Sequence, residues 1–456
     1  MTSRYVIAVV GGATAGAEAA GLLADHGTVV VVFEQHSRPY GKIEDGLPRW
    51  HLKLRQKEYE TVNNRLARPG VHFVPLTKIG RDIDFREIAT EWGFTAVILA
   101  VGAWRDRPFL VEDAEQYVGR GLIYQNPFIY WFNHFCERDY NGPQYQVEDG
   151  AIVVGGGLAS IDVIKVLQIE TVRLALERRG IRHDMLHLEH AGLAAALAEH
   201  GLTWESLGLR GATLFYRRRL EDMPLTDIPD DADVARRQKF ESTRRRILEK
   251  AMQKYRFHVQ PQRMPVGLLV EGDRLVGLRF QQTRVENGQV ILIEGAIEEV
   301  RAPLVISSIG SIPAPLPGIP QKGEVYDFAD LEFGRLAGYD TVFGAGNVVT
   351  GKGNILASRK HSLQVGTHVV EQFLGLGEDH VGEEVMLDAI TGAVDDSVER
   401  IAAWIRGRPP LDADKVEAIL RRVRARQEEV GYTGSYLDWI KRVTPPPQPA
   451  GPKVQP

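Results

Sequence analysis

Runs of consecutive apolar residues, each followed by glycines, divide this chain into segments. The first run, residues 5–10, leads into GGATAG at residues 11–16 and then into small residues that predict a helix through Leu23. A second apolar run, residues 28–33, ends at the acid Glu34. Continuous apolar runs of this length are typical of strands that are buried on both faces, as in a parallel sheet. The pattern predicts strand, helix and strand at the start of the chain.

A similar pattern recurs in the middle of the chain. AIVV begins at Ala151, GGGLAS follows at residues 155–160, and a helix is predicted through Leu167. The next strand pattern, residues 212–216, comes only after a long helical segment, which predicts an insertion before the second strand of this unit. Further strands are expected at residues 95–104 and 339–347.

The later segments differ in character. Residues 263–306 alternate as strands do, with a hairpin turn expected at residues 271–273. After residue 347 we expect the loop VVTGKGN and then a helix over residues 355–373. Residues 381–443 have the apolar periodicity of amphipathic helices. The tail, residues 444–456, is rich in proline and is predicted to be disordered.

The first glycine-rich turn has the chemistry of a dinucleotide site. Gly11 permits a tight turn, a small residue at Ala13 lets the backbone approach a pyrophosphate, and Gly16 lets the helix pack closely on the strand. Free N–H groups at the start of the helix suit phosphates, and Glu34 suits ribose hydroxyls. The turn departs from the usual pattern at its middle glycine, which is Ala13.

The second unit ends in arginines. Its turn carries Ser160 at the third glycine position, and its second predicted strand runs into Arg217, Arg218 and Arg219. Arginines at this place suit a 2′-phosphate, which they grip with paired donors, although a solvated basic turn is the alternative. Two such units in one chain predict FAD, in the first unit, and NADP(H), in the second.

Composition narrows the possible functions. The chain has 456 residues, of which 44% are hydrophobic and 25% are charged, with a net charge of −5, so we expect two or three domains and no nucleic-acid partner. The single cysteine, Cys136, excludes an intrachain disulfide, a CxxC redox pair and an iron–sulfur cluster held by this chain alone. The 13 histidines show no HExxH-like spacing, so no metal site is predicted. No apolar run is long enough to span a membrane, and a cytoplasmic location is expected.

In order along the chain, several stretches resemble one flavoprotein family: GGATAGAEAA, FEQHSRPYGKIEDGLPRWH, IGRDIDFREI, AVILAVGA, PFIYWFN, AIVVGGGLASIDVIKVL, FYRRR and GAGNVVTGKGNI. The chain resembles adrenodoxin reductase and the bacterial NADPH–ferredoxin reductases of that type, with glutamate synthase small subunits as more distant relatives. The resemblance covers about residues 5–375. The final motif is one residue shorter than in the family, and Asn347 replaces an aromatic residue there.

The resemblance implies roles for particular residues. His51 and Asp162 match residues that the family places near the flavin and the nicotinamide, where they are proposed to help proton movement. A buried structural histidine and a helix-dipole partner are the alternatives for these two. The positions that match cofactor-binding residues of the family, together with the glycines of the two turns, are Gly11, Ala13, Gly16, Glu34, Lys42, Ile79, Gly155, Gly156, Gly157, Leu158, Arg217, Arg218, Gly346, Asn347, Gly353 and Ile355.

The fold implied is α/β, with two Rossmann-like dinucleotide-binding domains and a helical extension. We place an FAD domain at residues 1–105 and 325–380, an inserted NADPH domain at 106–324, a helical extension at 381–443 and a tail at 444–456. The expected function is hydride transfer from NADPH to flavin, then single-electron transfer to a ferredoxin-like protein. The alternatives are a flavin-dependent monooxygenase and an electron-relay subunit of a larger complex.

Two surface features bear on partners. Residues 235–254 carry eight basic and two acidic residues, which predicts docking of an acidic electron-transfer protein on a surface that includes Arg244, Arg245 and Arg246; a solvated charged helix is the alternative. The helical extension carries Trp404, Tyr432, Tyr436 and Trp439, which would suit either a docking surface or packing against the body of the protein.

Overall fold

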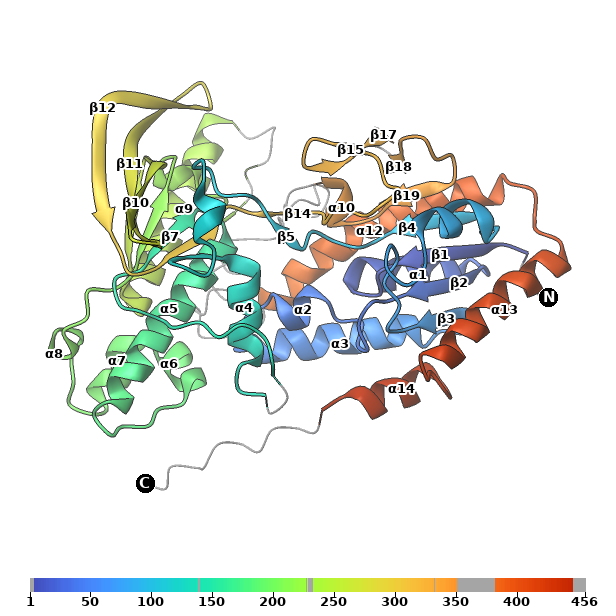
Figure 1. Cartoon of the computed structure of the whole chain (residues 1–456), viewed down its shortest axis with the longest axis horizontal. Helices are drawn as coiled ribbons and strands as arrows, with labels where there is room; N and C mark the ends of the chain where they lie inside the picture. Colours follow the sequence, from blue (N-terminus) through green and yellow to red (C-terminus); the bar gives the residue numbers. More distant parts are fainter. Residues whose placement is uncertain are drawn as a thin grey trace.

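The computed structural model describes residues 4–137, 140–226, 228, 233–331, 333–350 and 382–445. Within these ranges the chain forms two α/β bodies joined by paired connecting strands, with a helical extension at its carboxyl-terminal end (Figure 1). The α/β class with two Rossmann-like units and a helical extension is therefore confirmed. Because the sheets show which strands pair rather than where a domain ends, the domain boundaries stay a prediction.

The first body is built on a seven-stranded sheet in the order β17-β18-β19-β4-β1-β2-β3, in which β19, β4, β1, β2 and β3 run parallel. All five residues of β1 are buried, because helices cover both faces of the sheet. This double burial explains the uninterrupted apolar run in the sequence. The strands are β1 (Val6–Val10), β2 (Val29–Phe33), β3 (Val71–Val74), β4 (Ala96–Leu99), β17 (Phe328–Asp330), β18 (Arg335–Leu336) and β19 (Val342–Gly344).

Helices from both ends of the chain cover this sheet. On one face, Val398 and Ile401 of α12 pack with Ala17 and Leu23 of α1; on the other, Val423 of α13 packs beside β3. The helices of the first body and the extension are α1 (Thr14–Asp25), α2 (Lys42–Asp45), α3 (Leu52–Leu66), the π-helical turn η1 (Glu87–Glu91), α10 (Asn347–Thr350), α12 (Gly382–Arg406), α13 (Ala413–Glu429) and α14 (Tyr436–Val443).

The second body is built on a parallel five-stranded sheet in the order β6-β13-β7-β8-β9. The predicted insertion is present as α6, α7 and α8, which follow α5 and precede β8 and lie at the outer end of this body in Figure 1. The strands are β6 (Leu122–Tyr124), β7 (Ile152–Gly155), β8 (Thr213–Tyr216), β9 (His258–Pro261) and β13 (Val305–Ser308); the helices are η2 (Ala114–Tyr117), α4 (Gln125–His134), α5 (Leu158–Glu177), α6 (Met185–Ala191), α7 (Leu193–Ala198), α8 (Trp204–Leu207), η3 (Leu220–Asp222) and α9 (Val234–Tyr255).

The remaining strands form small antiparallel sheets. The expected hairpin turn lies between β10 and β11, and a third strand, β12, extends that sheet. The chain leaves the first body through β5 and returns through β14, and these two connecting strands pair with each other. The strands are β5 (Arg105–Asp106), β10 (Arg263–Glu271), β11 (Arg274–Glu286), β12 (Gln289–Arg301), β14 (Ser311–Ile312), β15 (Gln321–Lys322) and β16 (Val325–Tyr326).

Three expectations about elements need correction. The helix after β7 does not stop at Leu167, since apolar residues continue to face the core and α5 runs on to Glu177. The strands expected at residues 95–104 and 339–347 are shorter. The first pairs only over Ala96–Leu99, because the chain turns away toward β5, and the second only over Val342–Gly344, because the chain turns at Gly346 and enters α10 at Asn347. Residues 348–350 belong to the short helix α10 and are not a loop. The helix expected at residues 355–373 and most of the tail lie outside the described residues.

The aromatic residues of the extension pack inward. The indole Nε1 of Trp439 donates to the carbonyl of Ser37 at 2.7 Å, and the Tyr436 hydroxyl donates to Asn63 Oδ1 at 2.8 Å. Trp404 stacks edge-on against Phe343 of β19. These contacts favour the structural alternative for the aromatic residues and remove the feature that suggested a relay subunit. None of the helices in the described ranges combines the length and apolar composition that a bilayer crossing requires.

Replacing Trp439 with alanine tests whether the extension is part of the fold. The side chain is 4% exposed, and truncating a buried tryptophan costs about 3–5 kcal/mol of unfolding free energy. We expect this loss in urea unfolding followed by circular dichroism. Leu437→Ala is the control on the same helix, because Leu437 is 55% exposed and should change stability by less than about 0.5 kcal/mol. Equal effects of the two substitutions would contradict the inward packing.

Candidate functional site

The first glycine-rich turn brings a helix against a strand more closely than any side chain permits. Gly11 has φ of 99°, and a Cβ there would lie 2.6 Å from the carbonyl oxygen of Ala100. A Cβ on Gly16 would lie 1.8 Å from the carbonyl oxygen of Gly11. Both positions therefore require glycine, and the turn leaves the start of α1 open at the end of β1.

The alanine in place of the middle glycine has a structural explanation. Ala13 is the N-cap of α1, and a Cβ on Gly41 would lie only 2.8 Å from the Ala13 methyl group. Gly41, with φ of 50°, thus makes room for the side chain that Ala13 adds. The first turn of α1 has no acidic residue and no side-chain cap, so its N–H groups and the helix dipole remain suited to an anion.

Glu34 is positioned at the end of β2, as the sequence predicted. Its Oε2 accepts a hydrogen bond from the Gly12 amide at 2.8 Å, and its Oε1 accepts one from the His36 amide at 2.9 Å. Burial raises the pKa of this carboxyl group. The carboxylate therefore lies beside the glycine turn, and its role toward a ribose stays a prediction. Ile79 is 3% exposed in the core beside this sheet, so only its backbone remains to face a cofactor.

The last strand of the first sheet ends beside the same turn. Gly346 has φ of 74°, and a Cβ there would lie 2.8 Å from the Ala15 methyl group. Asn347 then begins α10, so two helix starts converge on the edge where β1 and β19 end. The predicted site residues Gly353 and Ile355 lie outside the described residues.

The second glycine-rich turn repeats this close approach with a different side chain. A Cβ on Gly155 would lie 2.2 Å from Ser160 Oγ and 2.3 Å from the Ser308 carbonyl oxygen. Ser160 Oγ instead donates to that carbonyl at 3.0 Å, occupying the space that Gly155 leaves. A Cβ on Gly156 would lie 2.3 Å from the Tyr216 ring. Gly157 is the N-cap of α5, whose first turn also has neither an acid nor a side-chain cap.

A cavity of about 620 Å³ opens at this second turn. Residues of both bodies line it, because the short helix α2 of the first body reaches the second-body turn. Its volume is in the range usual for small-molecule sites. The residues that line it include Lys42, Gly155, Gly156, Gly157, Leu158, Asp162, Arg217, Arg218 and Ser311.

The three consecutive arginines after β8 take different directions. Arg217 and Arg218 line the cavity, and Arg218 Nη1 also donates to the Gly288 carbonyl at 2.8 Å. Arg219 pairs with Asp222 at 2.9 Å and does not line the cavity, while Arg218 Nε lies 3.7 Å from the same carboxylate. The structure thus places at the cavity the two arginines that the sequence assigned to a 2′-phosphate; that assignment stays a prediction.

Lys42 connects the cavity to the junction of the two bodies. Its Nζ donates to Asn126 Oδ1 at 3.1 Å and to Ser311 Oγ at 3.3 Å. Asn126 Nδ2 donates in turn to Ser311 Oγ and to the Trp104 carbonyl, both at 3.0 Å. Burial lowers the pKa of Lys42 to about 8, and the nearby Asp106 carboxylate opposes that shift. Sequence reasoning missed Asp106, Asn126 and Ser311, which have no motif of their own.

His51 and Asp162 meet although they lie on different bodies. His51 is the N-cap of α3 and Asp162 lies on α5, yet His51 Nε2 is 3.9 Å from Asp162 Oδ1. Their side chains are 2% and 6% exposed. Asp162 Oδ1 has no hydrogen-bond partner within the described ranges, and Asp162 lines the cavity. Asp162 can therefore exchange a hydrogen bond with a proton donor or acceptor on a molecule bound in the cavity.

A buried ion pair lies one helical turn beyond Asp162. Lys165 is completely buried, and its Nζ lies 3.0 Å from Glu189 Oε1. The ammonium also lies over two rings, 4.7 Å from Trp50 and 4.8 Å from Tyr255. Burial alone would raise the pKa of Glu189, but the attraction of Lys165 and Lys254 outweighs it and lowers the pKa to about 2. This pair fixes Trp50, the residue before His51.

No protein-family model matches the chain. Curated relatives are similar along most of its length. The NADPH-ferredoxin reductase FprA of Mycobacterium tuberculosis is 25% identical over 445 residues, which cover 89% of this chain and 90% of that protein. The mitochondrial NADPH:adrenodoxin oxidoreductase of Arabidopsis thaliana is 23% identical over 371 residues, covering 71% of this chain and 74% of the relative.

A shorter match and a solved structure complete the comparison. The glutamate synthase [NADPH] small chain of Bacillus subtilis is 30% identical over 161 residues, about a third of each chain. The structure of Mycobacterium tuberculosis FprA in complex with NADPH superimposes with a TM-score of 0.62 at 19% identity, covering 93% of this chain and 91% of that one. The resemblance read from the sequence is thereby confirmed: this chain is similar in sequence to these three groups of reductases and synthase subunits, and it shares the fold of FprA.

Proposed function

We propose that this chain is an NADPH-dependent flavoprotein oxidoreductase of the ferredoxin–NADP reductase type. FAD is held at the first glycine turn and NADPH enters the cavity at the second. The observation that carries the proposal is that Lys42, which follows the first nucleotide-binding unit, lines the cavity of the second unit. The two nucleotide sites therefore face each other, which direct transfer between two cofactors requires.

The residues present fit both cofactors. The close contacts at Gly11 and Gly16 leave a turn that a pyrophosphate can approach, and the buried Glu34 is beside it to accept ribose hydroxyls. Arg217 and Arg218 supply the donors that a 2′-phosphate needs. Bound FAD would supply the redox chemistry, accepting a hydride equivalent and releasing electrons singly.

The chain's own residues hold the proton that accompanies this chemistry. His51 and Asp162 share a buried site between the two bodies, and the cavity reaches Asp162. His51 Nε2 is the atom of this pair that can take up or release a proton, and Asp162 Oδ1 lies 3.9 Å from it. Burial keeps bulk water from the pair, so the proton stays near the bound cofactors. We assign these two residues the proton-handling role.

The names of the relatives support this function over its alternatives. Two proteins that are similar over most of this chain are named as reductases that use NADPH and act on ferredoxin or adrenodoxin. None of the relatives described above is named as a monooxygenase. The acceptor is accordingly proposed to be a ferredoxin-like iron–sulfur protein. A cytoplasmic location remains part of the proposal, supported by the single unpaired cysteine.

The proposed docking surface must exclude one residue that the sequence suggested. Arg244 is buried: its Nε donates to the Thr226 carbonyl and its Nη1 to the Glu221 carbonyl, each at 2.9 Å. It therefore holds α9 to the preceding segment and cannot contact a partner. Arg245 and Arg246 are exposed, and Arg245 pairs with Glu221, which follows the cavity arginines. We propose that an acidic acceptor docks on this exposed part of α9.

The purified protein should be yellow, with about one FAD per chain. Glu34→Gln removes the charge that accepts ribose hydroxyls, and Gly11→Val fills the pyrophosphate path; both should retain less than about a tenth of the flavin. Flavin absorbance after gel filtration measures the retention. Gly407→Val is the control, since the backbone at Gly407 does not have a positive φ and there is room for a side chain there. A colourless wild-type protein that does not take up added FAD would overturn the first site.

NADPH should be preferred to NADH. Replacing Arg217 and Arg218 with alanine removes charge-assisted contacts worth about 1.5–3 kcal/mol, so the apparent NADPH constant should rise about tenfold or more while that for NADH changes little. Steady-state dye reduction measures both constants. Arg219→Ala is the matched control, because Arg219 pairs with Asp222 and does not line the cavity. Equal use of both nucleotides by the wild type would contradict the assignment of Arg217 and Arg218 to the 2′-phosphate.

Charge reversal at Arg245 and Arg246 should slow ferredoxin reduction severalfold and leave NADPH-to-dye reduction intact. The physical reason is loss of long-range attraction, so the wild-type rate should also fall steeply as the Debye length shrinks from about 30 Å at 0.01 M salt to about 10 Å at 0.1 M. Reversal of Arg421 and Arg424 on α13 makes the same charge change elsewhere on the surface. If both pairs of substitutions act alike, or both activities fall together, α9 is not the docking surface.

A further inference from the structure

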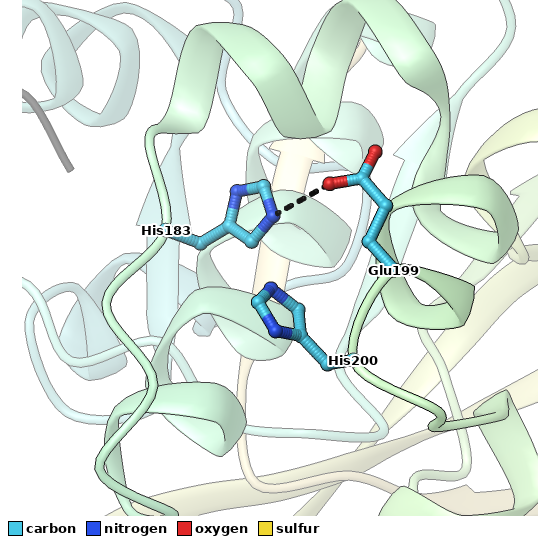
Figure 2. Close-up of side chains that lie close together, drawn as sticks. All are labelled: His183, Glu199 and His200. Atoms are coloured by element: carbon cyan, nitrogen blue, oxygen red, sulfur yellow. Dashed lines mark ion pairs between the residues drawn. The ribbon is translucent and has the colours of Figure 1, made fainter. Parts of the chain in front are cut away.

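Three histidines and a glutamate gather on the insertion between β7 and β8. His183 lies just before α6, His187 lies on α6, and Glu199 and His200 follow the end of α7. Figure 2 shows the side chains of His183, Glu199 and His200 pointing toward one another. We call these four residues the histidine cluster. None of them lines the cavity at the second glycine turn.

The donor atoms of the histidine cluster are close to the spacing of metal ligands. One ligand atom from each of His183, Glu199 and His200 lies within 4.8 Å of the other two. His183 Nε2 is 3.8 Å from Glu199 Oε2, and His187 Nε2 is 2.8 Å from Glu199 Oε1. In a tetrahedral zinc site with ligands at about 2.1 Å, donor atoms lie about 3.4 Å apart. Rotation of the exposed side chains can bring the donor atoms from their present separations to those of a zinc site.

The cluster is partly ordered before any ion binds. The His183 side chain is only 8% exposed, and the centre of its ring lies 4.9 Å from that of the His187 ring, at a tilt of 32°, and 5.2 Å from that of the His200 ring, which is edge-on. Glu199 and His200 are more exposed than His183 and provide the other two ligand atoms of the group. One fixed ligand and several adjustable ones form a site that can adapt to a tetrahedral ion.

The donor types select the class of ion. Imidazole nitrogens with one carboxylate suit zinc and its first-row neighbours, whereas calcium and magnesium require mostly oxygen ligands. Four of the 13 histidines fall between residues 183 and 200, a local enrichment that sequence spacing rules of the HExxH kind do not detect.

We propose that His183, Glu199 and His200, with His187 as a fourth ligand, bind one divalent transition-metal ion of the zinc class. The ion connects the loop before α6 to the turn after α7, and so holds the insertion together. The site is structural, because the histidine cluster contributes no residue to the cavity at the second glycine turn. This proposal is independent of the proposed redox function.

Metal titration of the full chain tests the proposal. The protein is freed of any purification tag, stripped with a chelator and titrated with ZnCl₂ by calorimetry, then with CoCl₂ by visible absorption. We expect one equivalent of Zn²⁺ to bind with a dissociation constant at or below the micromolar range. Bound Co²⁺ should give the intense d–d bands of tetrahedral coordination. Metal should also slow proteolysis within residues 178–210.

Substitutions decide whether the cluster is the site. The double variant His183→Ala, His200→Ala should lose the Co²⁺ bands and weaken Zn²⁺ binding at least a hundredfold, while retaining its circular dichroism and its flavin. His190→Ala is the matched control, since His190 is an exposed histidine on the same helix outside the cluster. Binding of less than about 0.2 equivalents by the wild type, octahedral Co²⁺ spectra, or equal binding by the double variant and the control would each overturn the proposal.

Discussion

The proposed redox function depends on how the two bodies of the chain are held face to face. The chain crosses between them twice, and the two crossings pair with each other as β5 and β14. Lys42 reinforces this junction by donating to Asn126 of the second body and to Ser311 of β14. A half-buried ammonium that loses these acceptors is costly, which favours one arrangement of the bodies over others. The approach of His51 to Asp162 follows from that arrangement, because the two residues belong to different bodies.

Much of the fold could be predicted because it depends on local rules. Apolar runs mark strands that are buried on both faces, and glycines mark turns where a helix start touches a strand. Even the two departures from the glycine pattern have local partners. Ala13 fits because Gly41 faces it, and Ser160 fits because Gly155 leaves room for its hydroxyl. Such compensation cannot be read from the turn alone, since Gly41 lies outside the motif.

What the sequence could not predict depends on contacts between distant segments. Helical periodicity identified α9 but not which of its arginines faces the body, so Arg244 was wrongly placed on the surface. Nothing in the sequence brings Lys165 to Glu189, or Lys42 to Ser311, because those pairs depend on packing of whole elements. The histidine cluster was missed for the same reason: a loop and a turn that flank two short helices bring its members together. Long-range polar contacts, unlike apolar runs, leave no periodic signal.

In the sequence, the segment that forms the second body lies between two segments of the first body, and this sets the order in which the two bodies can fold. The second sheet is assembled from strands between Leu122 and Ser308, an uninterrupted stretch that can fold as soon as it leaves the ribosome. The first sheet must wait, since β19 pairs with β4 and the late helix α12 covers α1. During synthesis the amino-terminal strands therefore remain exposed until more than 200 further residues have been added. A ribosome stalled before α12 would carry a finished second body beside an incomplete first one, which is the kind of intermediate that chaperones recognise.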